Sequence, residues 1–327
     1  MALLEIEDLR VTFPGPTGPI NAVNGVSLTL QPRQTLAILG ESGSGKSVTA
    51  QAVMGILDAP PARITGAVRL RGRELLHLPA HERDKVSGEE IAMVFQDAIA
   101  ALNPVYTVGH QIAEVLRVRR GMSRADAWRQ AIELVDRVHI PAAKDRVRDY
   151  PHQFSGGMRQ RIMIALAIAL EPDVLIADEP TTALDVTVQA QIMELLAEIQ
   201  QDNGMALLLI THDLGVVAEV ADDVVVMYAG RIVERGTVEQ IFARPAHPYT
   251  EALLASMPRL DRRDDVLYAI PGTPPNPARL PDGCPFHPRC SRAIDECRVS
   301  LPTLQPLSAG RASACHYWEE VLSAADR

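Results

Sequence analysis

Cysteine is missing from most of this chain, and aromatic residues are scarce throughout. The first 283 of the 327 residues contain no cysteine, and all four cysteines lie between positions 284 and 315. Aromatic residues make up 4% of the chain and hydrophobic residues 47%. Aliphatic side chains must therefore build the core, and the length indicates two domains or one large domain with an extension.

Long apolar runs and an export signal are also missing. The longest purely apolar run, Ile162–Leu170, has nine residues, whereas a helix that crosses a bilayer needs about 20. The first residues, MALLEIEDLR, carry acids where a signal peptide needs a basic region and a long apolar run. We expect a soluble, cytosolic protein, and any work at a membrane would need other subunits to span it.

An excess of basic charge is missing as well. The formal net charge is -9, whereas proteins that bind nucleic acid usually present a basic face. We therefore expect no nucleic-acid partner.

Alternating short strands and helices dominate what is present. The segments LLEIEDLRVTF, GVSLTL and TLAIL predict strands up to about residue 40, and helical patterns follow from about 97 to 155. A second alternation runs DVLIADE, VTVQAQIMELLAEIQQ and ALLLITHD, and VVVMYAGRIVERG predicts a hairpin around Ala229-Gly230. Beyond about 245, PGTPPNPARLPDG predicts a loop. The pattern indicates an α/β fold with a proline-rich C-terminal extension.

A glycine-rich loop, GESGSGKS, follows the predicted strand TLAIL and precedes the helical run VTAQAVMGIL. This context and the G-x-x-x-x-G-K-[ST] spacing predict a polyphosphate site, with a flexible glycine-serine turn as the alternative. Inward-pointing backbone N–H groups would cradle phosphate, Lys46 should reach the β and γ phosphates, and the Ser47 hydroxyl should bind Mg²⁺. The assigned residues are Gly40, Ser42, Gly43, Ser44, Gly45, Lys46 and Ser47.

Two acids end the apolar strand DVLIADE. A buried strand of a parallel sheet delivers them to the edge where the phosphate loop also lies. Asp178 would hold Mg²⁺, and Glu179 would polarise the attacking water as a general base. The alternative is a solvated strand end.

A second glycine motif opens the helical run FSGGMRQRIMIALAIAL. Ser155 can cap that helix, and Gly156 and Gly157 expose its first backbone N–H groups, which suits an anion. The sequence of this helix contains no other nucleotide-binding motif. An ordinary helix cap is the alternative.

These motifs together resemble those of ABC transporter ATP-binding subunits, over roughly residues 3 to 245. GESGSGKS is similar to the Walker A motif, VLIADE to Walker B, and FSGGM to the family signature, with Phe154 and Met158 at the places of its leucine and glutamine. The resemblance implies a P-loop NTPase with a RecA-like parallel sheet core. It also implies an N-terminal antiparallel β subdomain and an inserted helical subdomain at about 97–165, within a nucleotide-binding domain 1–245.

The resemblance also implies roles for single residues. Gln96 in MVFQD matches the glutamine that senses the γ-phosphate and Mg²⁺, and His212 matches the switch histidine. Asp185 matches the dimer-contact loop, and Phe13 the aromatic residue that stacks on adenine. The implied catalytic residues are Glu179, His212 and Gln96, and the implied Mg²⁺ ligands are Ser47, Gln96 and Asp178.

Partners follow from the same resemblance. In this family the phosphate loop of one ATPase faces the Ser-Gly-Gly helix of another, and ATP closes the pair. We expect a second, homologous ATPase as partner in a heterodimer, two transmembrane permease subunits, and a periplasmic or extracellular peptide-binding protein. The chain would sit peripherally on the cytoplasmic face of a bacterial inner membrane.

The C-terminal part, 246–327, indicates which subgroup of the family the chain resembles. HPYTEALLASMPRL and PGTPPNPARLPDGCPFHPRC are similar to the C-terminal extension of dipeptide and oligopeptide permease ATPases, and the dipeptide type matches best. This similarity implies an importer of dipeptides or oligopeptides. Another cargo (nickel, haem, a sugar or a peptide antibiotic) is the first alternative, since nothing in the chain contacts cargo. A non-transport ABC ATPase and a regulatory module without turnover are remoter ones.

The four cysteines have the spacing C-x5-C-x6-C-x17-C. Two disulfides would need an oxidising compartment, zinc sites usually show C-x2-4-C pairs, and an iron–sulfur cube tolerates wider loops. The family resemblance favours a [4Fe–4S] cluster on Cys284, Cys290, Cys297 and Cys315, with Zn²⁺ or unliganded thiols as alternatives. His287 and His316 could replace one ligand, although we expect them to lie outside the ligand set. Such a cofactor would tie together a tail with little core of its own.

Overall fold

The computed structural model describes residues 2–16, 18–182, 184–257 and 269–325. The chain divides into two compact units. Unit 1 comprises Met1–Leu30, Thr35–Leu76 and Ile210–Arg327, and unit 2 comprises Gln31–Gln34 and His77–Leu209. Within the described ranges, no helix combines the length and the apolar character that a bilayer crossing requires.

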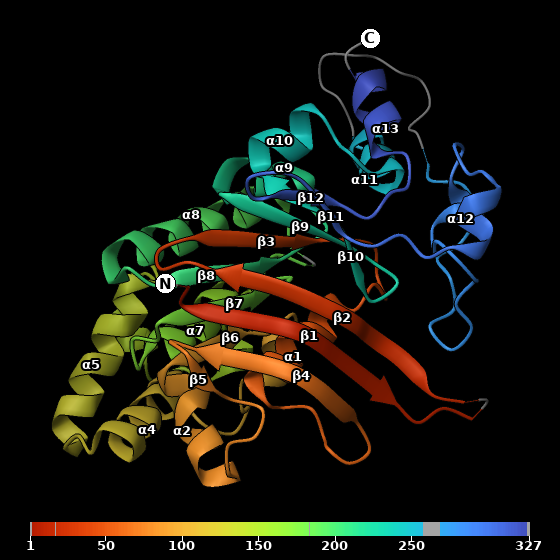
Figure 1. Ribbon diagram of the computed structural model, residues 1–327. Helices are drawn as coiled ribbons and strands as arrows, with labels where there is room; N and C mark the ends of the chain where they lie inside the picture. Colours follow the sequence, from red (N-terminus) through yellow and green to blue (C-terminus); the bar gives the residue numbers. More distant parts are fainter. Residues whose placement is uncertain (1, 17, 183, 258–268, 326–327) are drawn as a thin grey trace. The chain divides into compact units, whose positions relative to one another are not determined.

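Unit 1 contains an antiparallel sheet and a mixed sheet. The antiparallel sheet has the order β2-β1-β4-β5, and its long strands lie side by side in Figure 1. Its strands are β1 (Leu4–Phe13), β2 (Ile20–Leu30), β4 (Arg63–Leu70) and β5 (Arg73–Glu74). The predicted strands LLEIEDLRVTF and GVSLTL lie in β1 and β2, whereas β4 and β5 were not predicted. Alternating buried side chains along β1 and β2 give the sheet one apolar face.

The mixed sheet of unit 1 has the strand order β11-β12-β10-β9-β3. Its strands are β3 (Thr35–Leu39), β9 (Asp223–Tyr228), β10 (Arg231–Thr237), β11 (Gln305–Ser308) and β12 (Arg311–Ser313). Strands β3 and β9 are parallel, whereas β9, β10, β12 and β11 pair in antiparallel fashion. The helices of unit 1 are α1 (Lys46–Met54), α9 (Leu214–Val220), α10 (Val238–Ala243), α11 (Pro248–Ala255), α12 (Asp295–Val299) and α13 (Trp318–Ala325), with the short 3₁₀ helix η2 (His287–Arg289).

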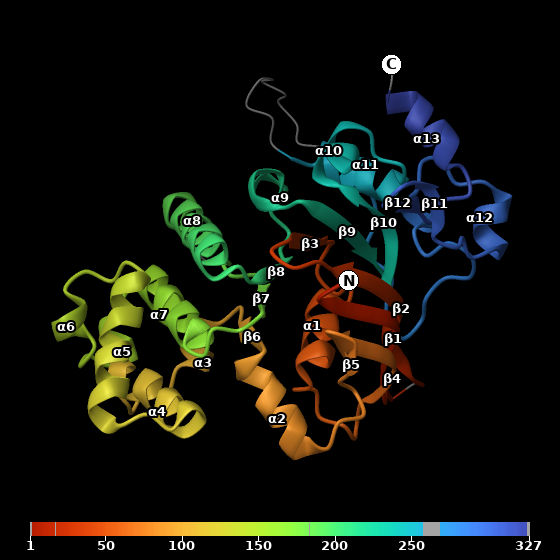
Figure 2. The same ribbon diagram turned by 60° about the vertical axis from the view of Figure 1, so that its left-hand side comes forward.

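Unit 2 contains parallel strands and a group of helices. The strands β6 (Ile91–Val94), β7 (Val174–Asp178) and β8 (Ala206–Ile210) follow the order β8-β7-β6, and β6 and β7 are parallel. The helices are α2 (Ala80–Glu89), α3 (Ala98–Ala101), α4 (Val108–Arg120), α5 (Arg124–Arg137), α6 (Ala143–Arg146), η1 (Pro151–Gln153), α7 (Gly156–Ile168) and α8 (Val186–Asn203). Figure 2 shows α4, α5, α6 and α7 gathered beside one another.

The local predictions of strands and turns are confirmed. The run TLAIL forms β3 and VLIAD forms β7, with every side chain buried, as expected of central parallel strands. Ala229 and Gly230 join β9 to β10 with φ angles of 50° and 76°, and this left-handed pair makes the predicted hairpin turn. The predicted α/β class is confirmed.

The C-terminal extension is not a separate module. Its strand β12 pairs with β10, where Glu234 lies opposite Ser313 and Arg235 opposite Ala312. Phe286 lies in the same hydrophobic cluster as the buried residues of β3 and β9. We predicted that the tail has little core of its own. The structure adds that the tail packs into the hydrophobic core of unit 1. The predicted loop after Pro271 contains no helix or strand as far as Phe286.

Candidate functional site

The phosphate loop, Gly40–Ser47, connects β3 to α1, as the sequence predicts. Gly45 has a φ of 99°, and a Cβ atom there would lie 2.4 Å from the carbonyl oxygen of Ala22. Only glycine fits this position, because both the backbone conformation and the close contact exclude a side chain. The loop leads into the N-terminus of α1, and backbone N–H groups at a helix N-terminus can bind a phosphate.

Lys46 is buried and folds back over the loop. Its Nζ donates to the carbonyl oxygens of Gly40 at 2.8 Å and Glu41 at 3.1 Å. The hydroxyl of buried Ser44 has no hydrogen-bond partner among the described residues. A buried cation held by two carbonyl dipoles, beside an unused hydroxyl, is suited to an anionic ligand.

The carboxylate Glu179 lies at the end of β7, one residue beyond buried Asp178. The parallel register pairs Val94 of β6 with Ala177 of β7, so residues that follow the two strands meet at one edge. There the Gln96 Nε2 donates to Glu179 Oε2 at 2.9 Å, and the Thr182 hydroxyl donates to the same oxygen at 2.9 Å. Two predicted catalytic residues are thus brought together.

The backbone of Glu179 is strained. Its φ of 47° is in the left-handed region, which costs a residue with a side chain about 1–3 kcal/mol. Thr182 helps to orient the carboxylate, and the sequence reasoning missed it. A threonine three residues after the strand-end glutamate was the available signal.

The Ser-Gly-Gly motif begins α7. The Ser155 hydroxyl accepts a hydrogen bond from the N–H of Met158 at 3.4 Å, as predicted for a helix cap. A Cβ atom on Gly157 would lie 2.5 Å from Cγ1 of Val188 in α8, so this glycine allows two helices to pack closely. A Cβ atom on Gly156 would meet only the Leu184 side chain, at 3.6 Å, so its surroundings are more open. The motif is thus both a packing element and an exposed helix N-terminus.

The remaining predicted nucleotide contacts lie on element ends. Asp185 caps α8 by accepting from the N–H of Val188 at 3.0 Å, and its side chain is exposed. His212 is exposed between β8 and α9. Phe13 is the last residue of β1, opposite Ile20, and is half-buried.

The four cysteines converge. Cys284, Cys290, Cys297 and Cys315 line one pocket together with His247, His287 and His316, among other residues. All four are free thiols. Burial raises the pKa of Cys284 to about 11 and that of Cys315 to about 12, and it also raises the pKa of Cys290. No group of three or more cysteine, histidine, aspartate or glutamate residues in the described ranges has the arrangement of a metal site.

Two of the three tail histidines, His287 and His316, each place one ring nitrogen against a backbone carbonyl. His287 Nδ1 lies 2.9 Å from the carbonyl oxygen of Cys284, and His316 Nε2 lies 3.0 Å from that of Ser300. Each contact uses one ring nitrogen only, so the expectation that these histidines lie outside the ligand set stays a prediction.

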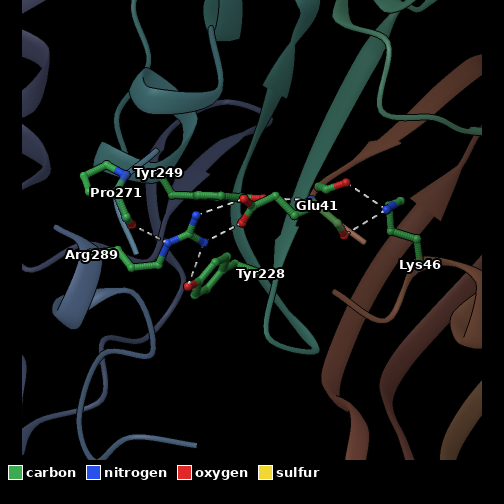
Figure 3. A network of polar contacts seen from close by, with 7 residues as sticks. Glu41, Lys46, Tyr228, Tyr249, Pro271 and Arg289 are labelled. Atoms are coloured by element: carbon green, nitrogen blue, oxygen red, sulfur yellow. Dashed lines mark hydrogen bonds and ion pairs between the residues drawn. The ribbon is translucent and has the colours of Figure 1, made fainter. Parts of the chain in front are cut away.

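The sequence reasoning also missed Glu41, inside the phosphate loop. Its carboxylate is bound by Arg289 of the tail, and its N–H donates to the hydroxyl of Tyr249 (Figure 3). The motif treats this position as variable, so only the fold could reveal the contact.

Comparison with known proteins shows the family of the chain. A family model described as "ABC transporter" matches residues 23–182, and one described as "Oligopeptide/dipeptide transporter, C-terminal region" matches residues 233–297. The oligopeptide transport ATP-binding protein OppD of Escherichia coli K12 is 52% identical over 314 residues, covering 96% of this chain and 93% of that protein. OppD of Haemophilus influenzae is 49% identical over 313 residues, covering 96% of each.

Solved structures agree with these relatives. A dimeric bacterial ABC transporter cassette superposes with a TM-score of 0.65 and 26% identity, over 72% of this chain and 98% of that one. The cbiO1 protein of Clostridium perfringens, part of an ABC transporter complex, gives a TM-score of 0.63 and 28% identity, over 74% and 91%. These comparisons confirm the predicted P-loop NTPase fold and the predicted resemblance.

Proposed function

This chain belongs to the ABC transporter family of ATP-binding subunits, and from that membership we propose that it is the ATP-hydrolysing subunit of a peptide importer. The observation that carries the cargo class is the match of residues 233–297 to the oligopeptide/dipeptide transporter C-terminal region. The relatives with the same tail are named for oligopeptide transport. The subunit would act peripherally, on the cytoplasmic face of the membrane, with two permease subunits that span it.

We assign binding of ATP to the phosphate loop. The N–H groups at the start of α1 and the Lys46 ammonium would hold the phosphates. The hydroxyl of Ser47, the carboxylate of Asp178 and the amide oxygen of Gln96 would hold Mg²⁺, which prefers oxygen ligands. The bound metal supplies charge neutralisation on the β and γ phosphates.

We assign hydrolysis to the edge of β7. Glu179 would orient the attacking water and accept its proton. The hydrogen bonds from Gln96 and Thr182 both fall on Oε2, and together they orient the carboxylate. His212 would contact the γ-phosphate.

We propose that catalysis requires a second ATPase subunit. The exposed N-terminus of α7, with Ser155, Gly156 and Gly157, suits a phosphate of a partner's nucleotide. Asp185 at the start of α8 would contact the partner beside it. A distinct, homologous partner, in a heterodimer, is our preferred assembly.

We further propose that the tail holds a [4Fe–4S] cluster, with Zn²⁺ as the alternative. Four cysteines around one pocket supply the donor set that such a cluster uses. The thiols would have to draw together and lose their protons on binding, because their raised pKa values keep them protonated at neutral pH. The cluster would then fix the tail loops.

The cofactor is tested on protein purified without oxygen. Iron, acid-labile sulfide and zinc are assayed on the same sample, beside a Cys290→Ser variant. Matching iron and sulfide that are lost in the variant support the cluster. Zinc without sulfide would make the tail a zinc site and reopen the choice of cargo.

The peptide function is tested on the complex reconstituted with its permease subunits and binding protein. We expect dipeptides or oligopeptides, presented on the binding protein, to raise the rate of ATP hydrolysis. A nickel complex, haem and a sugar serve as parallel ligands. Stimulation by one of these, and not by any peptide, would assign the subunit to another cargo.

A further inference from the structure

Glu41 has three polar groups, and each is engaged by a different partner (Figure 3). Its carbonyl oxygen accepts from Lys46 Nζ at 3.1 Å, within the phosphate loop. Its N–H donates to the hydroxyl of Tyr249 at 2.8 Å. Its carboxylate receives two hydrogen bonds from Arg289, at 2.6 and 2.9 Å. The loop residue is therefore fixed at its backbone and at its side chain by groups that lie more than 200 positions later.

Arg289 is itself held in place. Its side chain is only 4% exposed, and its Nε donates to the carbonyl oxygen of Pro271 at 2.9 Å. One Nη also lies 3.3 Å from the hydroxyl of Tyr228. The hydrogen bonds to Glu41 raise the pKa of the guanidinium further above its already high value. A two-pronged, partly buried ion pair of this kind fixes geometry as well as charge.

Aromatic rings surround the ion pair. The rings of Tyr228, Tyr249 and Phe286 pack with centroid distances of 4.6 to 5.3 Å. The Arg289 guanidinium lies 5.8 Å from the Tyr228 ring centroid and 6.0 Å from that of Phe286. Because Arg289 is buried beside these rings and Glu41 is partly buried, the charges attract one another more strongly than a fully exposed pair would.

The position of Arg289 depends on the cysteine-bearing loop. Arg289 is the last residue of η2, which lies between Cys284 and Cys290. The N–H of His287 donates to the carbonyl oxygen of Cys284, and the N–H of Cys290 donates to that of His287. The turn that carries the guanidinium is therefore the same turn that carries two of the four thiols.

We propose that Arg289 is a positioning residue for the phosphate loop. By holding the Glu41 carboxylate, it fixes the Glu41 carbonyl that binds Lys46, and so sets where the lysine and the loop N–H groups face the nucleotide. The tail thereby determines the affinity of the loop for ATP, through one ion pair. This inference rests on the proposed role of the loop in binding ATP.

The test compares nucleotide affinity among variants of the full-length chain. The dissociation constant of a fluorescent ATP analogue with Mg²⁺ is measured for Arg289→Ala, Arg289→Lys, Glu41→Gln and the double variant Glu41→Gln/Arg289→Ala. Arg292→Ala is the matched control, because Arg292 lies in the same tail and pairs with Glu251 instead of the loop. Thermal unfolding without nucleotide is recorded for each.

We expect Arg289→Ala to weaken binding about tenfold, the effect of a moderate coupling energy between contacting charged residues. Arg289→Lys should recover part of the loss, and Arg292→Ala should bind like the unaltered chain. The double variant should be no weaker than Arg289→Ala alone, because both changes remove the same interaction.

Three results would overturn the proposal. They are unaltered affinity in a folded Arg289→Ala variant, equal weakening by Arg292→Ala, and additive effects of the two changes in the double variant. If Arg289→Ala does not fold, Glu41→Gln decides alone, since it leaves the tail intact, and unaltered affinity there refutes the role. Failure of the unaltered chain to bind the analogue would refute the proposed nucleotide site itself.

Discussion

Glu179 and Glu41 are two carboxylates that follow buried strands, yet the chain holds them in different ways. Glu179, after β7, accepts hydrogen bonds from Thr182, three positions on, and from Gln96, after the neighbouring strand β6. Glu41, after β3, is held by Tyr249 and Arg289, 208 and 248 positions away. Glu179 is thus positioned by residues that follow β7 and the neighbouring strand β6, whereas Glu41 is positioned by residues of the tail.

The two arrangements leave different chemistry available. The two hydrogen bonds that orient Glu179 come from uncharged groups, an amide and a hydroxyl, which do not neutralise a carboxylate. Both oxygens of Glu41 are bound by Arg289, so its charge is already neutralised. We infer that Glu179 acts on the reaction and that Glu41 acts on the shape of the loop.

The same isosteric change at both positions should separate these roles. In the reconstituted complex, we expect Glu179→Gln to lower kcat about 100-fold or more, the usual contribution of a general base, because glutamine cannot accept the proton. The affinity for ATP should hardly change. Glu41→Gln should instead weaken ATP binding and leave kcat at saturating ATP within about threefold of its starting value.

Steady-state ATPase assays and direct binding titrations measure the two parameters separately. The comparison would break if Glu41→Gln lowered kcat as far as Glu179→Gln. It would also break if hydrolysis survived in Glu179→Gln, because another base would then have to be found.

What the sequence could predict depended on local signals. The uniformly apolar runs TLAIL and VLIAD predicted buried parallel strands, and Ala229-Gly230 predicted a turn of left-handed residues. Gln96 was predicted from its motif, and the parallel register of β6 and β7 explains why it meets Glu179. Each of these features depends on residues that are close in the sequence or on two adjacent strands, so a local pattern can predict it.

What the sequence could not predict arises from contacts across long separations. The segment QPLSAGRAS does not predict that β12 pairs with β10, because it is short and polar. In the sequence, Arg289 and Glu41 each lie in a loop that could be fully exposed, and only the fold makes them a partly buried pair. The thiol spacing predicted a shared site, whereas the pocket that the cysteines line follows from the packing of the tail.

Glu234, like Glu41, is a carboxylate that contacts an arginine of the tail, and we expect its replacement to have a smaller effect. Glu234 of β10 is fully buried, accepts from the N–H of Ala246 at 2.7 Å, and lies 3.4 Å from an Nη of Arg311. Burial raises its pKa from 4.5 to about 7, because the cost of desolvation exceeds the benefit of these partners. Arg289 binds Glu41 with two hydrogen bonds, whereas the contacts of Glu234 offset only part of the cost of burying its charge.

The sign of the resulting pH dependence follows from the two pKa values. Between pH 4.5 and 7 the folded chain keeps a proton on Glu234 that the unfolded chain releases, so its contribution to the free energy of unfolding falls as the pH rises. We expect that contribution to be fully present below pH 4.5 and to shrink by about 1–3 kcal/mol up to pH 8. In Glu234→Gln the side chain stays neutral and this loss should vanish.

Denaturant unfolding from pH 4.5 to 8 measures the effect as the difference between the unaltered chain and Glu234→Gln. The variant should gain stability relative to the unaltered chain as the pH rises. Glu239→Gln, on the exposed face of α10, is the matched control and should show little such trend. A difference that stays constant over this range would show that Glu234 remains charged when folded, and that Arg311 compensates it as fully as Arg289 compensates Glu41.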